Sequence, residues 1–205
     1  MNTRDPVLKT IKIDDLRPTQ MTVGYREVAE KRREWAERSD KGAGKFLGSH
    51  MIPTVLGPKG RNYVLDHHHL AMALHQAGQE EVCVTVLVDL SALGKGSFWT
   101  YLDNRAWCHP YDAEGRRQSF DAIPKQIEDL ADDPYRSLAG ELRRAGGYAK
   151  DTTPFSEFLW ADFLRTRVRA KQIKARFSAA LERAMSLAKS EDAGYLPGWC
   201  GPAPE

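Results

Sequence analysis

The chain has 205 residues, of which 41% are hydrophobic and 28% are charged, and its mean hydropathy is −0.54. This composition is typical of a globular protein with a hydrophobic core, and it excludes collagen-like, low-complexity and wholly disordered chains. Thirty Lys and Arg residues against 28 Asp and Glu residues give a formal net charge of +2. That balance is well below the strongly basic one of a dedicated nucleic-acid module, although it permits a local basic patch.

The sequence carries no sign of a membrane or secreted protein. No apolar run approaches the ~18 residues that a membrane helix needs, and the first ten residues contain no apolar segment before a cleavage site. Cys83, Cys108 and Cys200 are too few and too scattered for a disulfide framework or a CxxC metal site. We therefore expect a cytoplasmic protein with reduced cysteines and no membrane partner.

Strand-like and helix-like patterns alternate in the first half of the chain. Pro18 disfavours helix at the residue before it, Thr22 is a suitable helix N-cap, and a Pro/Gly cluster over 57–61 favours a hairpin turn. The expected elements are a strand over 7–13, a loop over 16–20, a helix over 22–38, a mobile glycine-rich break over 39–48, strands over 51–56 and 62–65, a helix over 70–76, and a central strand over 82–90.

The second half has the pattern of helices throughout. The expected helices cover 98–108, 124–131, 134–145, 155–168 and 171–189, and a Pro/Gly-rich, loosely docked tail follows over 194–205. The apolar stripe around Phe155, Phe158, Leu159 and Phe163 favours packing on the first half, because so small a set would be marginal alone. We therefore expect an α+β domain over 1–110, a helical extension over 111–193, and the tail.

The densest chemical cluster is Asp66-His67-His68-His69, where a strand leads into a helix. Backbone N–H groups at a helix N-terminus favour a bound anion, and imidazoles there can hydrogen-bond a phosphate or transfer a proton near neutral pH. Neighbouring side chains on a helix point ~100° apart, so three adjacent histidines do not converge on one metal. The alternative is structural: Asp66 caps the helix, which Gly78 ends, and one histidine packs inward.

A second candidate is the loop Arg17-Pro18-Thr19-Gln20, where a guanidinium, a hydroxyl and an amide lie just before a helix and suit an anionic ligand. An ordinary loop-to-helix junction is the alternative. The segment Gly42-Ala43-Gly44-Lys45 lacks the spacing of a phosphate-binding loop, so a flexible linker is favoured there.

Three further groups have structural alternatives that we favour. Asp129, Asp132 and Asp133 could bind a divalent cation, but an aspartate before Pro134 is the usual start of a helix. The pair Cys108-His109 has no third partner for nucleophilic catalysis. A basic stretch could bind nucleic acid or form a solvated helix face; its members are Arg165, Arg167, Arg169, Lys171, Lys174 and Arg176.

The segment DHHHLAMAL over 66–74 resembles the D-G-H-H-R-L-A-A-L signature of the ParB/sulfiredoxin superfamily. The loop LRPTQ over 16–20 is similar to the motif that precedes this signature in ParB-like domains. Together with Val23-Gly24 and the segments 132–139 and 155–165, these motifs resemble the ParB-like nuclease branch over most of the chain.

The resemblance implies a small mixed β-sheet, a helical C-terminal half, and a ligand site beside the DHHH turn. By this resemblance His68 and His69 are the expected catalytic or phosphate-contacting residues, and Asp66 orients them. Arg17, Thr19, Gln20 and His67 are the expected ligand-binding residues. Leu70 stands where the family has arginine, which removes a phosphate clamp, and the turn has no cysteine for sulfiredoxin chemistry.

Three functions follow in order of preference. The first is a ParB-like nuclease, or another enzyme that processes a phosphate-bearing small molecule, nucleotide or nucleic acid, such as a nucleotide-dependent phosphotransferase. A nuclease of this kind implies a divalent cation held by Asp66 and a histidine. The second is a non-catalytic module that binds an anion or a partner protein. The third is DNA binding through the basic C-terminal helix.

Overall fold

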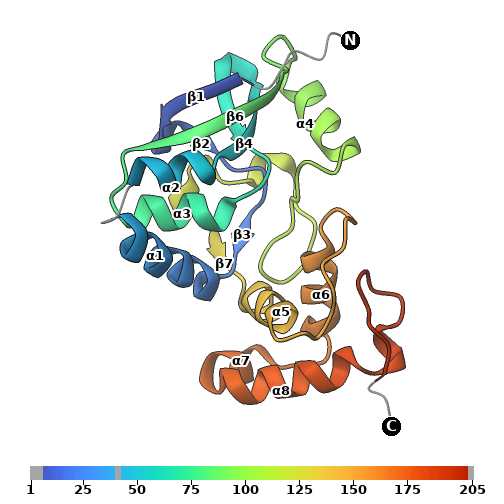
Figure 1. Cartoon of the computed structure of the whole chain (residues 1–205). Coiled ribbons are helices and arrows are strands. Elements are labelled where there is room, and N and C mark those ends of the chain that lie inside the picture. Colours follow the sequence, from blue (N-terminus) through green and yellow to red (C-terminus); the bar gives the residue numbers. More distant parts are fainter. Residues whose placement is uncertain (1–6, 40–42, 203–205) are drawn as a thin grey trace. The chain divides into compact units, whose positions relative to one another are not determined.

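The computed structural model describes residues 7–39 and 43–202. The chain divides into two compact units (Figure 1). The first contains the residues up to Val23 together with Val28–Ala131, and the second contains Gly24–Glu27 together with the residues from Asp132 onward. The first unit holds a five-stranded sheet and the second is helical, which confirms the expected α+β class.

The sheet has the strand order β1-β6-β4-β5-β2. Its strands are β1 (Val7–Lys12), β2 (Leu16–Arg17), β4 (Ile52–Gly57), β5 (Arg61–Val64) and β6 (Glu81–Asp89). The pairs β1–β6 and β4–β5 are antiparallel, whereas β4–β6 and β2–β5 are parallel, so the sheet is mixed as expected. The expected hairpin is confirmed as β4–β5, which turns through Pro58–Gly60, where Lys59 and Gly60 have φ values of 63° and 68°.

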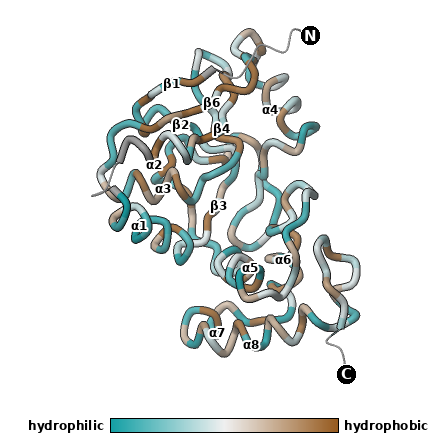
Figure 2. The backbone as a smooth tube through the Cα atoms, in the orientation of Figure 1, coloured by the Kyte–Doolittle hydropathy of each residue, from teal (hydrophilic) through white to brown (hydrophobic). Residues whose placement is uncertain are grey.

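The helices of the first unit are α1 (Tyr25–Ser39), apart from its residues 25–27, which belong to the second unit, α2 (Ala43–Ser49), α3 (His68–Gln76) and α4 (Lys95–Asn104). The main core lies between α3, whose Ala71, Ala73 and Leu74 are almost wholly buried, and the sheet residues Ile52 and Val84. Figure 2 shows the contrast between the brown segments of β6 and the largely teal turns of α1, which are rich in charged residues.

Three expectations for local structure in the first unit were wrong. Thr22 caps no helix but lies in the short strand β3 (Thr22–Val23), and α1 starts at Tyr25. The break expected over 39–48 contains α2, so Ala43, Gly44 and Lys45 are helical, while residues 40–42 lie outside the described residues. The helix expected over 124–131 is a 3₁₀ turn, η4 (Ile127–Asp129), followed by the strand β7 (Ala131–Asp132), which pairs with β3.

A second cluster of the first unit surrounds α4. Val55, Leu90, Phe98 and Leu102 form its centre, and the irregular segment after α4 closes it with Ile123. A single 3₁₀ turn, η3 (Phe120–Ala122), interrupts that segment. The cluster holds the aromatic side chains that reappear below at the candidate site.

The second unit consists of α5 (Pro134–Arg144), α6 (Ser156–Arg165), α7 (Ala170–Ala175), α8 (Phe177–Ala188) and the 3₁₀ turn η5 (Glu191–Ala193). Asp133 caps α5 and Pro134 is its first residue, which confirms the expected helix start. The helix expected over 171–189 is broken at Arg176, whose φ and ψ of −145° and 67° are not helical.

The core of the second unit centres on Trp160, which is fully buried and stacks on Tyr148 with the ring centroids 4.3 Å apart. The Pro/Gly-rich segment after Gly194 packs against this core. The indole N–H of Trp160 donates to the carbonyl of Pro197 at 2.8 Å, and the backbone N–H of Ala149 donates to the carbonyl of Gly198 at 2.7 Å.

Candidate functional site

The DHHH turn connects β5 to α3 through a left-handed residue. His67 has a φ of 68° and precedes the first residue of α3, and its backbone N–H donates to Oδ1 of Asp66 at 2.6 Å. Both residues are exposed. The expected capping of α3 by Asp66 was wrong, because the cap position belongs to His67, which makes no side-chain capping bond.

His68 is the inward-pointing histidine of the three. Its side chain is 3% exposed, and its Nε2 accepts a hydrogen bond from the backbone N–H of Thr19 at 3.2 Å. His69 is half-buried on the next position of α3. The structure therefore brings the DHHH turn and the loop over 17–20 together, through His68 and Thr19.

Thr19 and Gln20 make hydrogen bonds inside the protein. The hydroxyl of Thr19 donates to the carbonyl of Val64 at 2.6 Å, and the carbonyl of Thr19 accepts from the backbone N–H of His109 at 2.8 Å. The side-chain amide of Gln20, which is 6% exposed, donates to the carbonyl of Thr22 at 2.8 Å. These bonds fix the loop, and ligand contact by either side chain stays a prediction.

Arg17 is anchored through one edge of its guanidinium. Its Nη1 donates to the carbonyls of Asp14 at 3.1 Å and Lys125 at 2.7 Å, and to the side-chain oxygen of Gln126. Its Nε is buried and has no hydrogen-bond partner among the described residues. The anchoring places the guanidinium at the wall of a cavity of about 240 Å³ in the first unit.

This cavity, which we call the basic pocket, combines cations with an apolar and aromatic lining. Its thirteen lining residues are Arg17, Pro18, Pro58, Lys59, Arg61, Tyr63, Lys95, Trp99, Phe120, Asp121, Ile123, Pro124 and Lys125. Five of them are cationic and one, Asp121, is a carboxylate that is already hydrogen-bonded to Lys95. An anionic ligand therefore meets an excess of positive charge beside an apolar wall.

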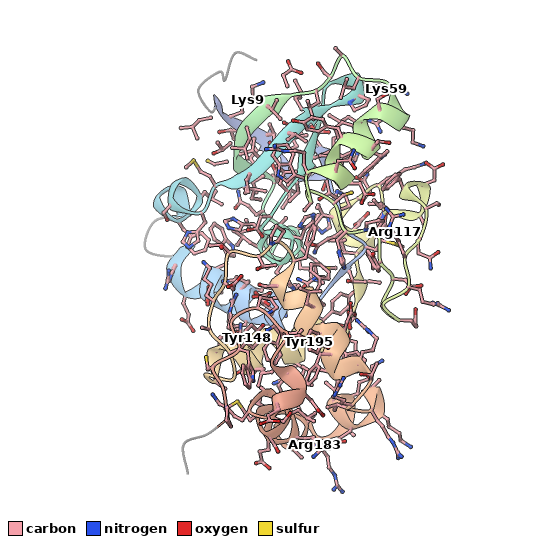
Figure 3. The ribbon with its side chains drawn as sticks, turned by 90° about the vertical axis from the view of Figure 1, so that its right-hand side faces the viewer. Lys9, Lys59, Arg117, Tyr148, Arg183 and Tyr195 are labelled. Carbon is pink, nitrogen blue, oxygen red and sulfur yellow. The ribbon has the colours of Figure 1, made fainter. Side chains whose placement is uncertain are left out.

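The aromatic part of the basic pocket is ordered by ring contacts. Trp99 and Phe120 stack with their centroids 5.8 Å apart and their planes at 9°, and Tyr63 meets Trp99 edge-on at 5.6 Å. The guanidinium of Arg117 lies 5.4 Å from the centroid of the Phe120 ring. Figure 3 labels Lys59, at the β4–β5 turn, and Arg117, on the loop after α4.

Of the expected site residues, the structure places only Arg17 in the basic pocket. The other members were missed because they come from separated segments, whose individual lysines and arginines are typical of any protein surface. The one local indication in the sequence is the turn between β4 and β5, in which Lys59 and Arg61 follow Pro58.

The remaining candidates have structural partners. Burial, to which the neighbouring Asp103 carboxylate adds, raises the pKa of the Cys108 thiol to about 12, so this cysteine is a poor nucleophile near neutral pH. In the basic stretch, Arg165 is bound to Asp133 at 2.8 Å. The rest of that stretch is divided between the α6–α7 connection, α7 and the break at Arg176, so the expectation of a single basic helix was wrong.

Within 7–39 and 43–202, no three His, Cys, Asp or Glu side chains converge in an arrangement that could hold a metal ion. Over the same ranges, no helix has both the length and the apolar character needed to span a membrane.

Comparison with known proteins shows a similar solved structure and a family. The crystal structure of protein Atu1540 from Agrobacterium tumefaciens is 52% identical to this chain and superposes with a TM-score of 0.91, covering 97% of this chain and 100% of that one. No curated protein matches the sequence. A family model described as "Putative ParB-like nuclease" matches residues 9–166. The match extends over both halves of the chain, and the chain therefore belongs to the ParB-like nuclease family.

Proposed function

We propose that this protein binds a phosphate-bearing ligand, either a nucleotide or a segment of nucleic acid, in the basic pocket of its first unit. The observation that carries the proposal is the charge of that pocket, where five cationic side chains face one carboxylate that is already paired with Lys95. Phosphate is the common biological anion that Arg and Lys side chains bind in such numbers.

The anchoring of Arg17 supports this assignment. A guanidinium binds phosphate best through two parallel N–H groups. Nη1 of Arg17 is occupied by protein carbonyls, while Nε has no partner among the described residues. A buried N–H group without a partner is costly, so this edge of the guanidinium gains an acceptor if the atoms that cover Nε move when a phosphate binds. The apolar wall with Tyr63 and Phe120 suits a sugar or a base.

Asp66 and His69 do not line the basic pocket, so for the chemical step we propose hydrolysis in a nucleic-acid strand that extends from the pocket to the DHHH turn, which the family name supports. Water attacks the phosphorus, and the sugar oxygen leaves as a hydroxyl group. Asp66 is exposed, and its Oδ1 accepts a hydrogen bond from the N–H of His67. His69 lies three residues further along the chain and is half-buried. Asp66 and a histidine would supply at most two ligands of a divalent cation, and solvent would complete its shell, because no three such side chains converge among the described residues. A cation held there would offset the charge of the phosphate.

The second candidate function is a binding module without catalysis. Its supporting observations are Leu70 in place of the family arginine and the burial of His68 against Thr19. Both remove groups that a catalytic site at the DHHH turn would use.

Binding of a fluorescein-labelled, 5′-phosphorylated single-stranded DNA of ten nucleotides tests the proposal by fluorescence anisotropy. We expect Arg61→Glu to abolish most of the binding and Lys9→Glu, the same charge reversal on exposed β1 of the same unit, to leave it intact. Equal affinity of Arg61→Glu and the wild type would overturn the basic pocket as the site. Cleavage in the presence of Mg²⁺ or Mn²⁺ that is lost in Asp66→Asn supports the nuclease, whereas binding without cleavage supports the module.

A further inference from the structure

We propose that His68 is a positioning residue, whose imidazole holds the loop over 17–20 in the conformation that presents Arg17 to the basic pocket. This inference rests on the function proposed above and assigns His68 a role different from the catalytic one expected from the sequence. The histidine acts on the ligand only through the backbone of Thr19.

The hydrogen bond between Thr19 and His68 specifies the state of the imidazole. A backbone N–H is always a donor, so Nε2 of His68 must carry a lone pair and the ring proton must lie on Nδ1. Both groups are buried, with Thr19 at 1% and His68 at 3% exposure. Water therefore does not replace the bond if it is lost, and the Thr19 N–H is left without an acceptor.

Thr19 is held at each of its polar groups. His68 accepts from its N–H, Val64 accepts from its hydroxyl, and the N–H of His109 donates to its carbonyl. Val64 belongs to the paired strand β5, and His109 forms a β-bridge with Gln20, so these two partners are held by backbone pairing. The third partner, His68, is the one that depends on the chemistry of a side chain.

The path from Thr19 to Arg17 is short and stiff. Only Pro18 separates them, and its ring fixes one of the two backbone torsions of that residue. Pro18 is itself buried and lines the basic pocket. On the other side of Pro18, Arg17 of β2 pairs with Tyr63 of β5, which also lines the basic pocket. A shift of Thr19 therefore moves the guanidinium relative to the cations from β5 and α4.

Hydrogen exchange of the Thr19 amide, followed by NMR on the full chain, tests the anchor directly. Glutamine places its side-chain oxygen about as far along the side chain as Nε2, so we expect His68→Gln to preserve the slow exchange of this amide. We expect His68→Leu to accelerate it by about tenfold or more, because no acceptor remains. His50→Leu, the same change at a half-buried histidine elsewhere in the first unit, is expected to leave the exchange of the Thr19 amide unchanged.

The effect of His68 on ligand binding is tested with the same labelled decanucleotide. We expect wild type and His68→Gln to bind alike, and His68→Leu to bind about tenfold more weakly. Equal binding by the wild type and both variants, or slow exchange of the Thr19 amide in His68→Leu, would overturn the positioning role. If the wild type does not bind the decanucleotide, the nucleic-acid form of the proposed function is wrong, and Thr19 exchange still decides whether His68 holds the loop.

A third variant, His68→Asn, distinguishes the position of the acceptor from the polarity of the side chain. His68→Asn carries its oxygen at the position of Nδ1 and cannot reach Thr19, although it is as polar as His68→Gln. We expect the Asn variant to resemble His68→Leu in both measurements. Rescue by Asn as complete as rescue by Gln would show that polarity alone suffices and would contradict the geometry proposed.

Discussion

Asp132 and Asp133 are adjacent in the sequence and bind the first amides of two different helices. Oδ1 of Asp132 accepts from the backbone N–H of Tyr25, the first residue of α1, at 2.9 Å. Oδ1 of Asp133 accepts from the N–H of Tyr135, in the first turn of α5, also at 2.9 Å. Each carboxylate satisfies a donor that the helix itself cannot use and offsets the positive end of the helix dipole.

The two aspartates are expected to differ in their contribution to stability. Asp133 is 2% exposed and also binds Arg165 at 2.8 Å, so Asp133→Ala removes both a cap and the partner of a largely buried cation. We expect a loss of about 3 kcal/mol in the free energy of unfolding for Asp133→Ala and of about 1 kcal/mol for Asp132→Ala. Urea unfolding measures both. Equal losses would mean that the Arg165 pair contributes nothing.

Gly24 lies where another backbone leaves no room for a side chain. A Cβ atom at Gly24 would stand 2.5 Å from Oγ and 2.7 Å from the backbone N of Ser137. We expect Gly24→Ala to lower the free energy of unfolding by about 1–3 kcal/mol.

The matched control for Gly24 is Gly48, which lies in α2 with nothing within 4 Å of its Cβ position. Gly48→Ala is expected to raise stability by about 0.5–1 kcal/mol, because alanine loses less backbone entropy in a helix. Thermal unfolding of the pair checks both signs, and a stable Gly24→Ala would show that Ser137 can move aside.

Arg136 contributes more through its shape than through its charge. It is 4% exposed, its guanidinium lies 3.5 Å from the centroid of the Phe158 ring, and its Nε and Nη1 have no partners among the described residues. Burial lowers its pKa, and the nearby carboxylates, Glu157 first, only partly oppose this.

We expect Arg136→Met, which keeps the contact with Phe158, to cost less than about 1.5 kcal/mol. Arg136→Ala leaves a cavity and is expected to cost about 2–4 kcal/mol. Chemical denaturation of the two variants separates shape from charge. A loss for Arg136→Met as large as that for Arg136→Ala would show that the charge is essential.

Cys108 and Cys200 are expected to differ sharply in reactivity. Only the thiolate reacts with iodoacetamide, and the pKa of Cys108 is raised to about 12 by burial and by Asp103, whereas Cys200 is exposed. We expect alkylation of the native protein at pH 8 to modify Cys200 and spare Cys108, as read by peptide mass spectrometry. Full modification in urea is the control, and rapid native labelling of Cys108 would contradict its burial.

The same shift of Cys108 has a consequence for stability. Burial raises the pKa of its thiol from 9.0, the value taken for the unfolded chain, to about 12 in the folded chain. The contribution of this thiol to the free energy of unfolding is fully present below pH 9. It is lost as the pH rises from 9 through the pKa of the folded state, because the unfolded chain gives up the proton first. The decline in stability between pH 9 and 11 is expected to be shallower in Cys108→Ala.

Elements with local signals at both ends were predictable from the sequence. The helix α5 has Asp133 and Pro134 at its start and glycines after its end, and the β4–β5 hairpin has its Pro/Gly turn. The start of α1 was missed because its capping oxygen lies 107 residues away, on Asp132. Likewise the local sequence does not indicate β7, because this strand is defined by its pairing with β3.

The candidate site was less predictable than the fold. The family motifs correctly singled out the loop of Arg17 and the DHHH turn as neighbouring segments, and His68 contacts Thr19. No local pattern indicates which of three histidines is buried, because that depends on the neighbouring strand and loop. The basic pocket depends on four separated segments that meet only in the folded sheet.

The bond between Asp132 and α1 can form only late in translation. The ribosome synthesises the strands and helices from β1 to α4 before it reaches Asp132, which binds the first amide of α1. Until then the bond from this amide to Asp132 cannot form. A nascent chain that stalls before residue 132 therefore lacks the carboxylate that stabilises the first turn of α1.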